Sequence, residues 1–389
     1  MNSPFEKIIP NNIINPNDYY TYNNRGTLIE IHTADLHFGA MDPKIQYDIL
    51  MTQLVGKVSN LNFDVFFING DIFHHKFMSN SDVIMYASMF IDQVVQLCRN
   101  KNATLVILHG TASHDANQLK LFYHYIGTLD IRIIEHIQFE MIKGSKVLCI
   151  PEEYNMGSDY YINMLYNMGS YDMAVLHGAV KGSIFGCNEE NLSSNKAPVF
   201  DINSFRNCNG PIICGHVHIP GCYQQHIYYS GSPLRWQFGE EESKGFIICL
   251  HNLDSHQYYI HLEEITSFRY DTITLDDMIN NDPKDIISYV SNLKSQGIDY
   301  IKIRFTENSN NVNILKKYYK NDFNTAIDAS DIQFQETIKE NQKANEKFQQ
   351  YSYIMDDNLS PYEIFTRYVN QCKGEQFISV DELTKILSD

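Results

Sequence analysis

The stretch Val65-Phe66-Phe67-Ile68-Asn69-Gly70-Asp71, which continues into Ile72-Phe73-His74, decides the fold class. Its first four residues are apolar and either β-branched or aromatic, which indicates a short buried strand. Gly70 and Asp71 come directly after this strand, where the chain leaves the sheet. Because the ligand crevice of an open α/β sheet lies along the carboxyl ends of its strands, Asp71 is a candidate site residue.

Strand-like apolar runs alternate with helical patterns on both sides of this stretch, from Thr27 to about Glu264. Residues 45–58 and 84–98 carry apolar side chains at helical spacing. The other runs predict strands at 28–31, 105–108, 147–150, 174–176, 212–214, 227–229 and 246–250. This alternation predicts a layered α/β domain.

A smaller α/β unit is predicted to follow at residues 266–330. It contains strands at 272–275 and 300–305 and helices at 285–293 and 312–319. Beyond it, Ser360 and Ser379 each begin a capping box, which predicts two short helices. The predicted organisation is a polar N-terminal extension at 1–26, a main domain at 27–265, the small unit at 266–330 and a C-terminal helical segment at 331–389.

The composition is that of an ordinary folded protein, with 43% hydrophobic and 20% charged residues. The eight cysteines form no C-x-x-C pair, which indicates reduced thiols in a cytosolic protein. Residues 1–25 lack the basic start and apolar run of a signal peptide, and no stretch is apolar enough to cross a bilayer. We therefore expect a cytoplasmic location, which is the host cytoplasm if the protein is viral.

The net charge of −17 argues against a subunit that binds nucleic acid without a partner, since DNA-binding surfaces are usually basic. Bound divalent cations would place positive charge where a phosphate must sit. The charge is thus compatible with action on nucleic acid only if cations or a partner supply part of the attraction.

Acidic residues and histidines follow five of the predicted strands. They are Asp35 and His37, then Asp71, then His114 and Asp115, then His177, and last His216 and His218. Each of these pieces alone is weak evidence, but strand ends meet at one edge of a sheet, so their convergence predicts a metal site. Carboxylates together with imidazoles suit manganese, iron or zinc. Two such ions, about 3.5–4 Å apart, clamp a phosphodiester and activate water. Asp71 is expected to bridge them with its two oxygens.

These motifs, in this order, resemble those of the calcineurin-like metallophosphoesterases. The motifs are Asp35-Leu36-His37, Gly70-Asp71, His114-Asp115, His177-Gly178 and Gly215-His216-Val217-His218. Two further stretches are similar to the SbcD branch of DNA repair nucleases and to related phage nuclease subunits. They are Gly70-Asp71-Ile72-Phe73-His74, and Tyr229-Ser230-Gly231-Ser232-Pro233-Leu234-Arg235 followed by Phe238-Gly239-Glu240.

The resemblance implies a layered metallophosphoesterase β-sandwich flanked by helices, with a small DNA-facing α/β cap and a C-terminal helical tail. It also implies two divalent ions, with manganese expected. Carried over by position, the first ion is held by Asp35, His37, Asp71 and His218, and the second by Asp71, His177, His216 and a residue of the third motif. His114 would stabilise charge on the phosphate or protonate the leaving oxygen, and His74 would order the DNA end.

The third motif departs from the family pattern Gly-Asn-His-Asp. Here Gly110 is followed by extra residues, and Ser113 stands directly before His114 where the asparagine ligand is expected. A hydroxyl oxygen is a poorer ligand than an amide carbonyl, so Ser113 is a candidate weak ligand. Trp236, the one tryptophan, is expected to pack in the core, with stacking on a base as the alternative.

The resemblance implies a manganese-dependent exonuclease and endonuclease subunit of an SbcCD-like recombination and repair complex. Its partners would be DNA ends, hairpins or single strands and an SbcC-type coiled-coil ATPase that docks on residues 331–389. Such subunits are commonly dimeric, so a homodimer is implied too. No association with a membrane is expected. The alternatives are a phosphatase or phosphodiesterase of the same superfamily with a small substrate, and a weakly active scaffold.

Overall fold

The computed structural model describes residues 26–127, 130–153, 158–181, 199–223, 226–240, 242–275, 282–305, 311–322 and 324–328. The chain divides into two compact units, Met1–Tyr270 and Asp271–Asp389. Within the described ranges, no helix combines the length and apolarity needed to span a bilayer. The N-terminal extension and the predicted helices at Ser360 and Ser379 lie outside the described residues.

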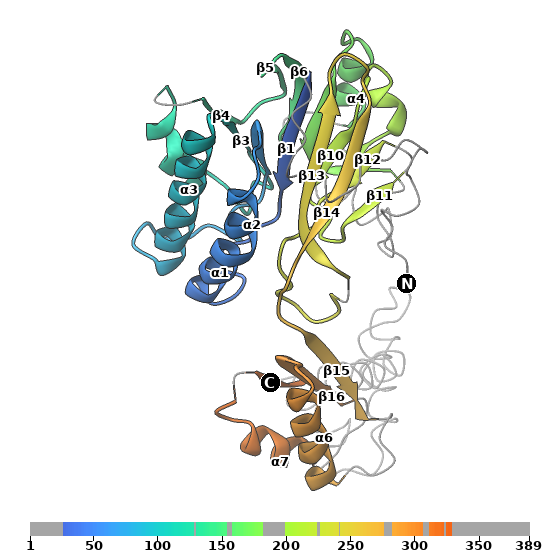
Figure 1. Ribbon diagram of the computed structural model, residues 1–389. Helices are drawn as coiled ribbons and strands as arrows, with labels where there is room; N and C mark the ends of the chain where they lie inside the picture. The colour runs from blue at the N-terminus through green and yellow to red at the C-terminus, as the bar shows by residue number, and fades with distance from the viewer. Residues whose placement is uncertain are drawn as a thin grey trace, which may run out of the picture. The chain divides into compact units, whose positions relative to one another are not determined.

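Two six-stranded sheets form the framework of the first unit (Figure 1). The first sheet has the order β14-β13-β1-β2-β3-β4 and consists of β1 (Thr27–Thr33), β2 (Val65–Asn69), β3 (Thr104–Leu108), β4 (Ile131–Ile134), β13 (Lys244–Asn252) and β14 (Tyr258–Ile265). The second has the order β11-β12-β10-β7-β6-β5 and consists of β5 (Gln138–Ile142), β6 (Ser145–Ile150), β7 (Met173–His177), β10 (Ile212–Gly215), β11 (Gly221–Tyr223) and β12 (Ile227–Tyr229). The predicted layered α/β class is confirmed, although β4, β5, β11 and β14 were not predicted.

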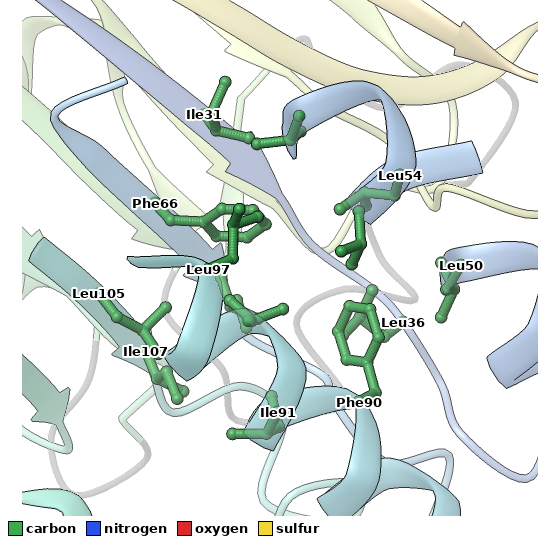
Figure 2. Packing of buried hydrophobic residues seen from close by; sticks show 14 of the residues in the cluster. Ile31, Leu36, Leu50, Leu54, Phe66, Phe90, Ile91, Leu97, Leu105 and Ile107 are labelled. Carbon is green, nitrogen blue, oxygen red and sulfur yellow. The ribbon is translucent and has the colours of Figure 1, made fainter. Parts of the chain in front are cut away.

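Helices cover the outer face of the first sheet. They are α1 (Pro43–Ile49), the π-helix η2 (Leu50–Val55), α2 (Gly56–Ser59) and α3 (Asp82–Lys101). Ser81 caps the N-terminus of α3 by accepting a hydrogen bond from the backbone N–H of Ile84. In Figure 2, Phe90 and Ile91 of α3 belong to the same buried cluster as Ile31 and Phe66 of the sheet. Burial of this apolar face is what holds the helices on the sheet.

A second core lies between the two sheets, where Phe67 and Val106 of the first sheet pack with Val147 and Val175 of the second. The outer face of the second sheet is covered by α4 (Ser158–Tyr166) and the 3-10 helix η4 (Ile202–Phe205). The short strands β8 (Ala179–Val180) and β9 (Val199–Phe200) pair beside them, and the 3-10 helix η3 (Gln118–Tyr125) follows the third motif. This is a sandwich of two sheets between two helical layers.

The parallel strands β1 to β3 and β6, β7 and β10 bring their carboxyl ends to the loops that carry the predicted ligands. Parallel strands align their carboxyl ends at one edge of each sheet, so loops that are distant in sequence can meet there. The fold thus delivers the geometry on which the predicted site depends.

The second unit is a small three-stranded sheet with two helices. Its elements are β15 (Tyr270–Thr274), α6 (Pro283–Ser295), β16 (Tyr300–Arg304), α7 (Asn311–Tyr318) and β17 (Thr325–Asp328), in the sheet order β15-β16-β17. Asp282 caps α6 by accepting from the backbone N–H of Lys284 at 2.8 Å, and Pro283 is the first helical residue. Ile286, Val290 and Ile301 form the centre of its own hydrophobic core.

Candidate metal centre

Four of the predicted ligands adopt backbone conformations that non-glycine residues rarely take. The φ angles are 53° at Asp35, 48° at His37, 55° at Asp71 and 89° at His216. Such left-handed conformations cost free energy and persist only where the surroundings enforce them. Here the backbone N–H of Asp35 donates to the carbonyl of Gly70 at 3.0 Å, and that of His37 donates to the carbonyl of Asp71 at 3.0 Å. The first two ligand loops are therefore locked to each other.

Asp115, the last residue of the third motif, stabilises these loops through hydrogen bonds to their backbone. Its fully buried carboxylate accepts hydrogen bonds from the backbone N–H groups of Gly110 (2.8 Å), Asp71 (3.1 Å), Ile72 (2.9 Å) and Phe73 (3.2 Å). With both oxygens engaged by amides, Asp115 is placed to position Asp71 and not to bind a ligand itself.

The first half of the centre joins Asp35, His37, Asp71 and His218. His37 Nε2 lies 3.0 Å from His218 Nε2, 4.0 Å from Asp35 Oδ1 and 3.7 Å from Asp71 Oδ2. His218 Nε2 lies 3.8 Å from Asp35 Oδ1. Ligand atoms that share one ion at about 2.0–2.2 Å stand roughly 3–4 Å from one another. The donor atoms of Asp35, His37 and His218 therefore lie close enough together to share a single divalent cation, and Asp71 Oδ2 lies beside them.

The histidines of this half are held in their neutral form. Burial lowers the pKa of His37 to about 2, and the neighbouring His218 and His114 add to the effect. Burial also lowers the pKa of His218. A neutral imidazole keeps a lone pair for a metal ion, so the environment favours the protonation state that a ligand needs.

The second half joins Asp71, Glu152, His177 and His216. His177 Nε2 lies 3.3 Å from Asp71 Oδ2 and 3.7 Å from Glu152 Oε2, while His216 Nδ1 lies 3.4 Å from Glu152 Oε2. His177 Nδ1 contacts the carbonyl oxygen of Asn69 at 2.6 Å. An imidazole that donates from one nitrogen to a carbonyl directs the other nitrogen at a metal, as is typical of metal-binding histidines.

The two halves share Asp71. Its Oδ2 is the atom that faces both His37 and His177, whereas its Oδ1 accepts the backbone N–H of Thr111 at 2.6 Å. Although burial raises the pKa of Asp71, the charge and hydrogen bond of His177 outweigh it and lower the pKa. The expected bridge through both oxygens of Asp71 stays a prediction, and Oδ2 is the oxygen that faces both donor sets.

Thr111, and not Ser113, supplies the hydroxyl of the third motif. Thr111 Oγ1 lies 3.2 Å from Asp71 Oδ2, 3.1 Å from Glu152 Oε2 and 3.4 Å from His177 Nε2. Ser113 is exposed, and its side chain makes no hydrogen bond to any described residue. Thr111 directly follows Gly110, so it is the hydroxyl beside the second donor set, and Ser113 lies on the exposed side of the loop.

Glu152 was not among the predicted ligands, although it follows the end of a strand as the predicted ligands do. It lies two residues after β6 ends at Ile150, and its side chain is buried beside His177 and His216. A carboxylate just past the end of a parallel strand is the pattern that identified Asp71.

His74 and His114 lie against the first half of the centre. Their ring centroids are 5.4 Å and 4.8 Å from that of His37, and His114 Nδ1 hydrogen bonds to the carbonyl of His74. Gln118 Nε2 donates to the carbonyls of both His75 and His114 at 3.1 Å, which ties the two loops together. The structure thus brings both predicted catalytic histidines to the site, while their roles stay predictions.

Trp236 does not pack in a hydrophobic core, contrary to expectation. It is half-buried, and its ring lies against His37, His74 and His218. The turn that carries it, residues 230–240, is the second stretch that resembles the SbcD branch.

Comparison with known proteins gives one sequence relative of interest. The chain is 25% identical over 224 residues to a protein of Invertebrate iridescent virus 6 named "Putative phosphoesterase 244L", a match that covers 56% of this chain and 74% of the viral protein. No protein-family model matches the chain.

Two solved structures, of a cold-active protein tyrosine phosphatase and of a single-residue variant of it, align at 15% and 12% identity. Each alignment covers 60% of this chain and 78% or 80% of the other, with TM-scores of 0.27 and 0.26. A likeness this low carries no argument about fold or function.

Proposed function

We propose that this chain is a metal-dependent phosphodiesterase that cleaves DNA. The observation that carries the proposal is the convergence of six predicted ligands into two donor sets that share Asp71 Oδ2. The similarity to a viral protein named as a phosphoesterase supports phosphoester hydrolysis as the reaction class.

The donor sets suit a pair of divalent cations. Asp35, His37, Asp71 and His218 would hold one ion, and Asp71, His177, His216, Glu152 and the Thr111 hydroxyl would hold the other. Mixed carboxylate and imidazole ligands favour manganese, iron or zinc over calcium or magnesium, and we propose Mn²⁺. When bound, such ions supply Lewis acidity toward phosphate oxygens and increase the nucleophilicity of water.

The chain's own residues would orient the substrate and move protons. His114 lies close enough to the first donor set to protonate the leaving oxygen or to stabilise charge on the phosphate. His74 sits beside it and would contact the end of the DNA strand. Gln118 would hold the backbone at His75 and His114 in place, and Asp115 would hold that of Asp71.

We further propose that the chain is the nuclease subunit of an SbcCD-like complex for recombination and repair. The motifs Gly70 to His74 and Tyr229 to Glu240 support this assignment by resemblance. In it, the second unit would face DNA, residues 331–389 would dock on an SbcC-type ATPase, and two copies would form a homodimer. The net charge of −17 is consistent with a subunit that needs bound cations and a partner to hold DNA.

A nuclease assay tests the proposal. End-labelled linear duplex DNA, hairpins and single strands would be incubated with the full-length protein and Mn²⁺, with and without the ATPase partner. We expect Mn²⁺-dependent shortening that chelation abolishes. Turnover of a chromogenic phosphodiester without any cleavage of DNA, with or without the partner, would instead favour an enzyme for small substrates.

A further inference from the structure

Trp236 places a large aromatic surface directly beside the candidate metal centre. Its ring centroid lies 5.3 Å from that of His37, 5.2 Å from that of His74 and 5.3 Å from that of His218. The residue as a whole is partly exposed. Its ring therefore lies beside the histidines that a substrate phosphate would approach.

A buried carboxylate fixes the turn that carries the indole. Glu240 Oε2 accepts hydrogen bonds from the backbone N–H groups of Trp236 at 2.9 Å and Gln237 at 3.2 Å. Glu240 Oε1 in turn accepts from Lys244 Nζ at 2.9 Å. The backbone at Trp236 is thus held by a charge-assisted network and not by loop packing alone.

The same lysine also holds a candidate metal ligand. The Lys244 side chain is fully buried, and its Nζ donates to the carbonyl of His218 at 2.9 Å and to Ser232 Oγ at 3.0 Å. A buried ammonium is costly unless several acceptors surround it, so this arrangement persists because its partners are in place. One buried cation consequently sets the position of both Trp236 and His218.

The indole N–H of Trp236 is a buried donor. Trp236 Nε1 is buried and has no hydrogen-bond acceptor among the described residues. An indole can only donate, and leaving a buried donor unpaired costs about 1–3 kcal/mol. A ligand that brings an oxygen or nitrogen acceptor next to the ring would relieve this cost.

We propose that Trp236 is a substrate-contacting residue that stacks on the nucleobase flanking the scissile phosphate. This inference rests on the proposed function and names the part of the substrate that the enzyme recognises beyond its phosphate. Stacking of one base on an aromatic side chain contributes about 1–3 kcal/mol and tolerates any sequence, since every base has a π face.

The single tryptophan makes the contact directly measurable. The Asp71→Asn variant, in Mg²⁺, would be titrated with oligo(dT) and with an abasic oligonucleotide of the same length, with excitation at a wavelength that tyrosine does not absorb. Stacking predicts that oligo(dT) quenches the emission and the abasic strand does not. Equal quenching by both strands, or no quenching where anisotropy shows that oligo(dT) is bound, overturns the proposal.

Kinetics on the same two strands give a second test with a matched control. Trp236→Ala should reduce the preference in kcat/KM for oligo(dT) over the abasic strand by about tenfold, the equivalent of roughly 1.4 kcal/mol. Trp236→Phe, which keeps a ring, should reduce it less, and Gln237→Ala, an exposed neighbour, should leave it unchanged. An unchanged preference in Trp236→Ala refutes the contact while leaving the nuclease proposal intact. If the wild type cleaves neither strand, the proposed function fails, and the fluorescence titration alone decides the role of Trp236.

Discussion

Among the described residues of the sandwich, a second buried cluster of histidines and acids lies apart from the candidate metal centre and differs from it in geometry. The second cluster is Glu30, His32 and His251, all at most 1% exposed and located on β1 and β13. His32 Nε2 lies 3.5 Å from Glu30 Oε2, and His251 Nδ1 lies 3.7 Å from Glu30 Oε1. By residue type and burial, this cluster resembles the candidate metal centre.

The difference lies in where the backbone places the side chains. Glu30 and His32 stand on the regular face of a strand, and His251 pairs opposite Leu28, so the histidines approach Glu30 from opposite sides. The donor atoms of Glu30, His32 and His251 do not all come within 4.8 Å of one another, whereas those of Asp35, His37 and His218 do, and so do those of Glu152, His177 and His216. Positive φ angles at strand ends turn Asp35, His37 and Asp71 toward a common point, which a regular strand cannot do.

The largest expected effect is the loss of activity in Asp71→Asn. Since Asp71 Oδ2 faces both donor sets, replacing the carboxylate with an amide should lower Mn²⁺-dependent cleavage of linear DNA by about 10³-fold. Asp48→Asn serves as the control, because this exposed carboxylate on α1 pairs only with Lys44 on the surface. If Asp71→Asn cleaves DNA as well as Asp48→Asn does, the proposed metal-dependent chemistry is wrong.

Glu30→Gln should affect stability and leave metal binding alone. Removing one member of a buried, paired cluster costs on the order of 3 kcal/mol, so denaturant unfolding at neutral pH should show a loss of about that size. The protein should still bind its full complement of Mn²⁺ under folding conditions. A change in metal stoichiometry would show that the two clusters are not functionally distinct.

Glu30→Gln should also differ from the wild type in how its stability depends on pH. Burial raises the pKa of Glu30, but the interactions with the adjacent His251 and His32 rings outweigh it and lower the pKa to about 2. A carboxyl with a depressed pKa stabilises the fold above its ordinary value of 4.5 and loses that contribution as the pH falls toward 2. The free energy of unfolding of the wild type should therefore decline across this window more steeply than that of Glu30→Gln, as urea titrations at several pH values would measure. Parallel declines would contradict the assignment.

Thr111→Ala and Ser113→Ala should differ in their affinity for Mn²⁺, by a smaller factor than the loss of activity in Asp71→Asn. Loss of the Thr111 hydroxyl, which contacts Asp71, Glu152 and His177, should weaken Mn²⁺ binding at the donor set of these residues by about tenfold. Ser113→Ala should bind Mn²⁺ as the wild type does, because Ser113 is exposed. Calorimetric titration with Mn²⁺ measures both, and the reverse ranking would restore Ser113 as the ligand.

The sequence predicted the parts of this site that depend on strand ends alone. Asp71, His177 and His216 follow apolar runs that are short enough to be strands, and the period of a strand places its end within a residue or two. Glu152 follows the strand at 147–150 in the same way, so its position after a strand end predicts it as well.

What could not be predicted depends on loop conformation and on contacts between distant loops. Spacing from His114 suggested Ser113, but the loop from Gly110 to Asp115 turns so that Thr111 faces inward. Trp236 reaches the centre only because Glu240 and Lys244 fix its turn from the far end of the motif. Such hydrogen bonds to the backbone leave no periodic signal in a sequence.

Anomalous diffraction at the manganese edge from crystals grown with Mn²⁺ tests the central claim most directly. We expect two peaks, one among Asp35, His37, Asp71 and His218 and the other among Asp71, His177 and His216, with Asp71 Oδ2 adjacent to both. Absence of both peaks, or manganese bound instead between Glu30, His32 and His251, would contradict it.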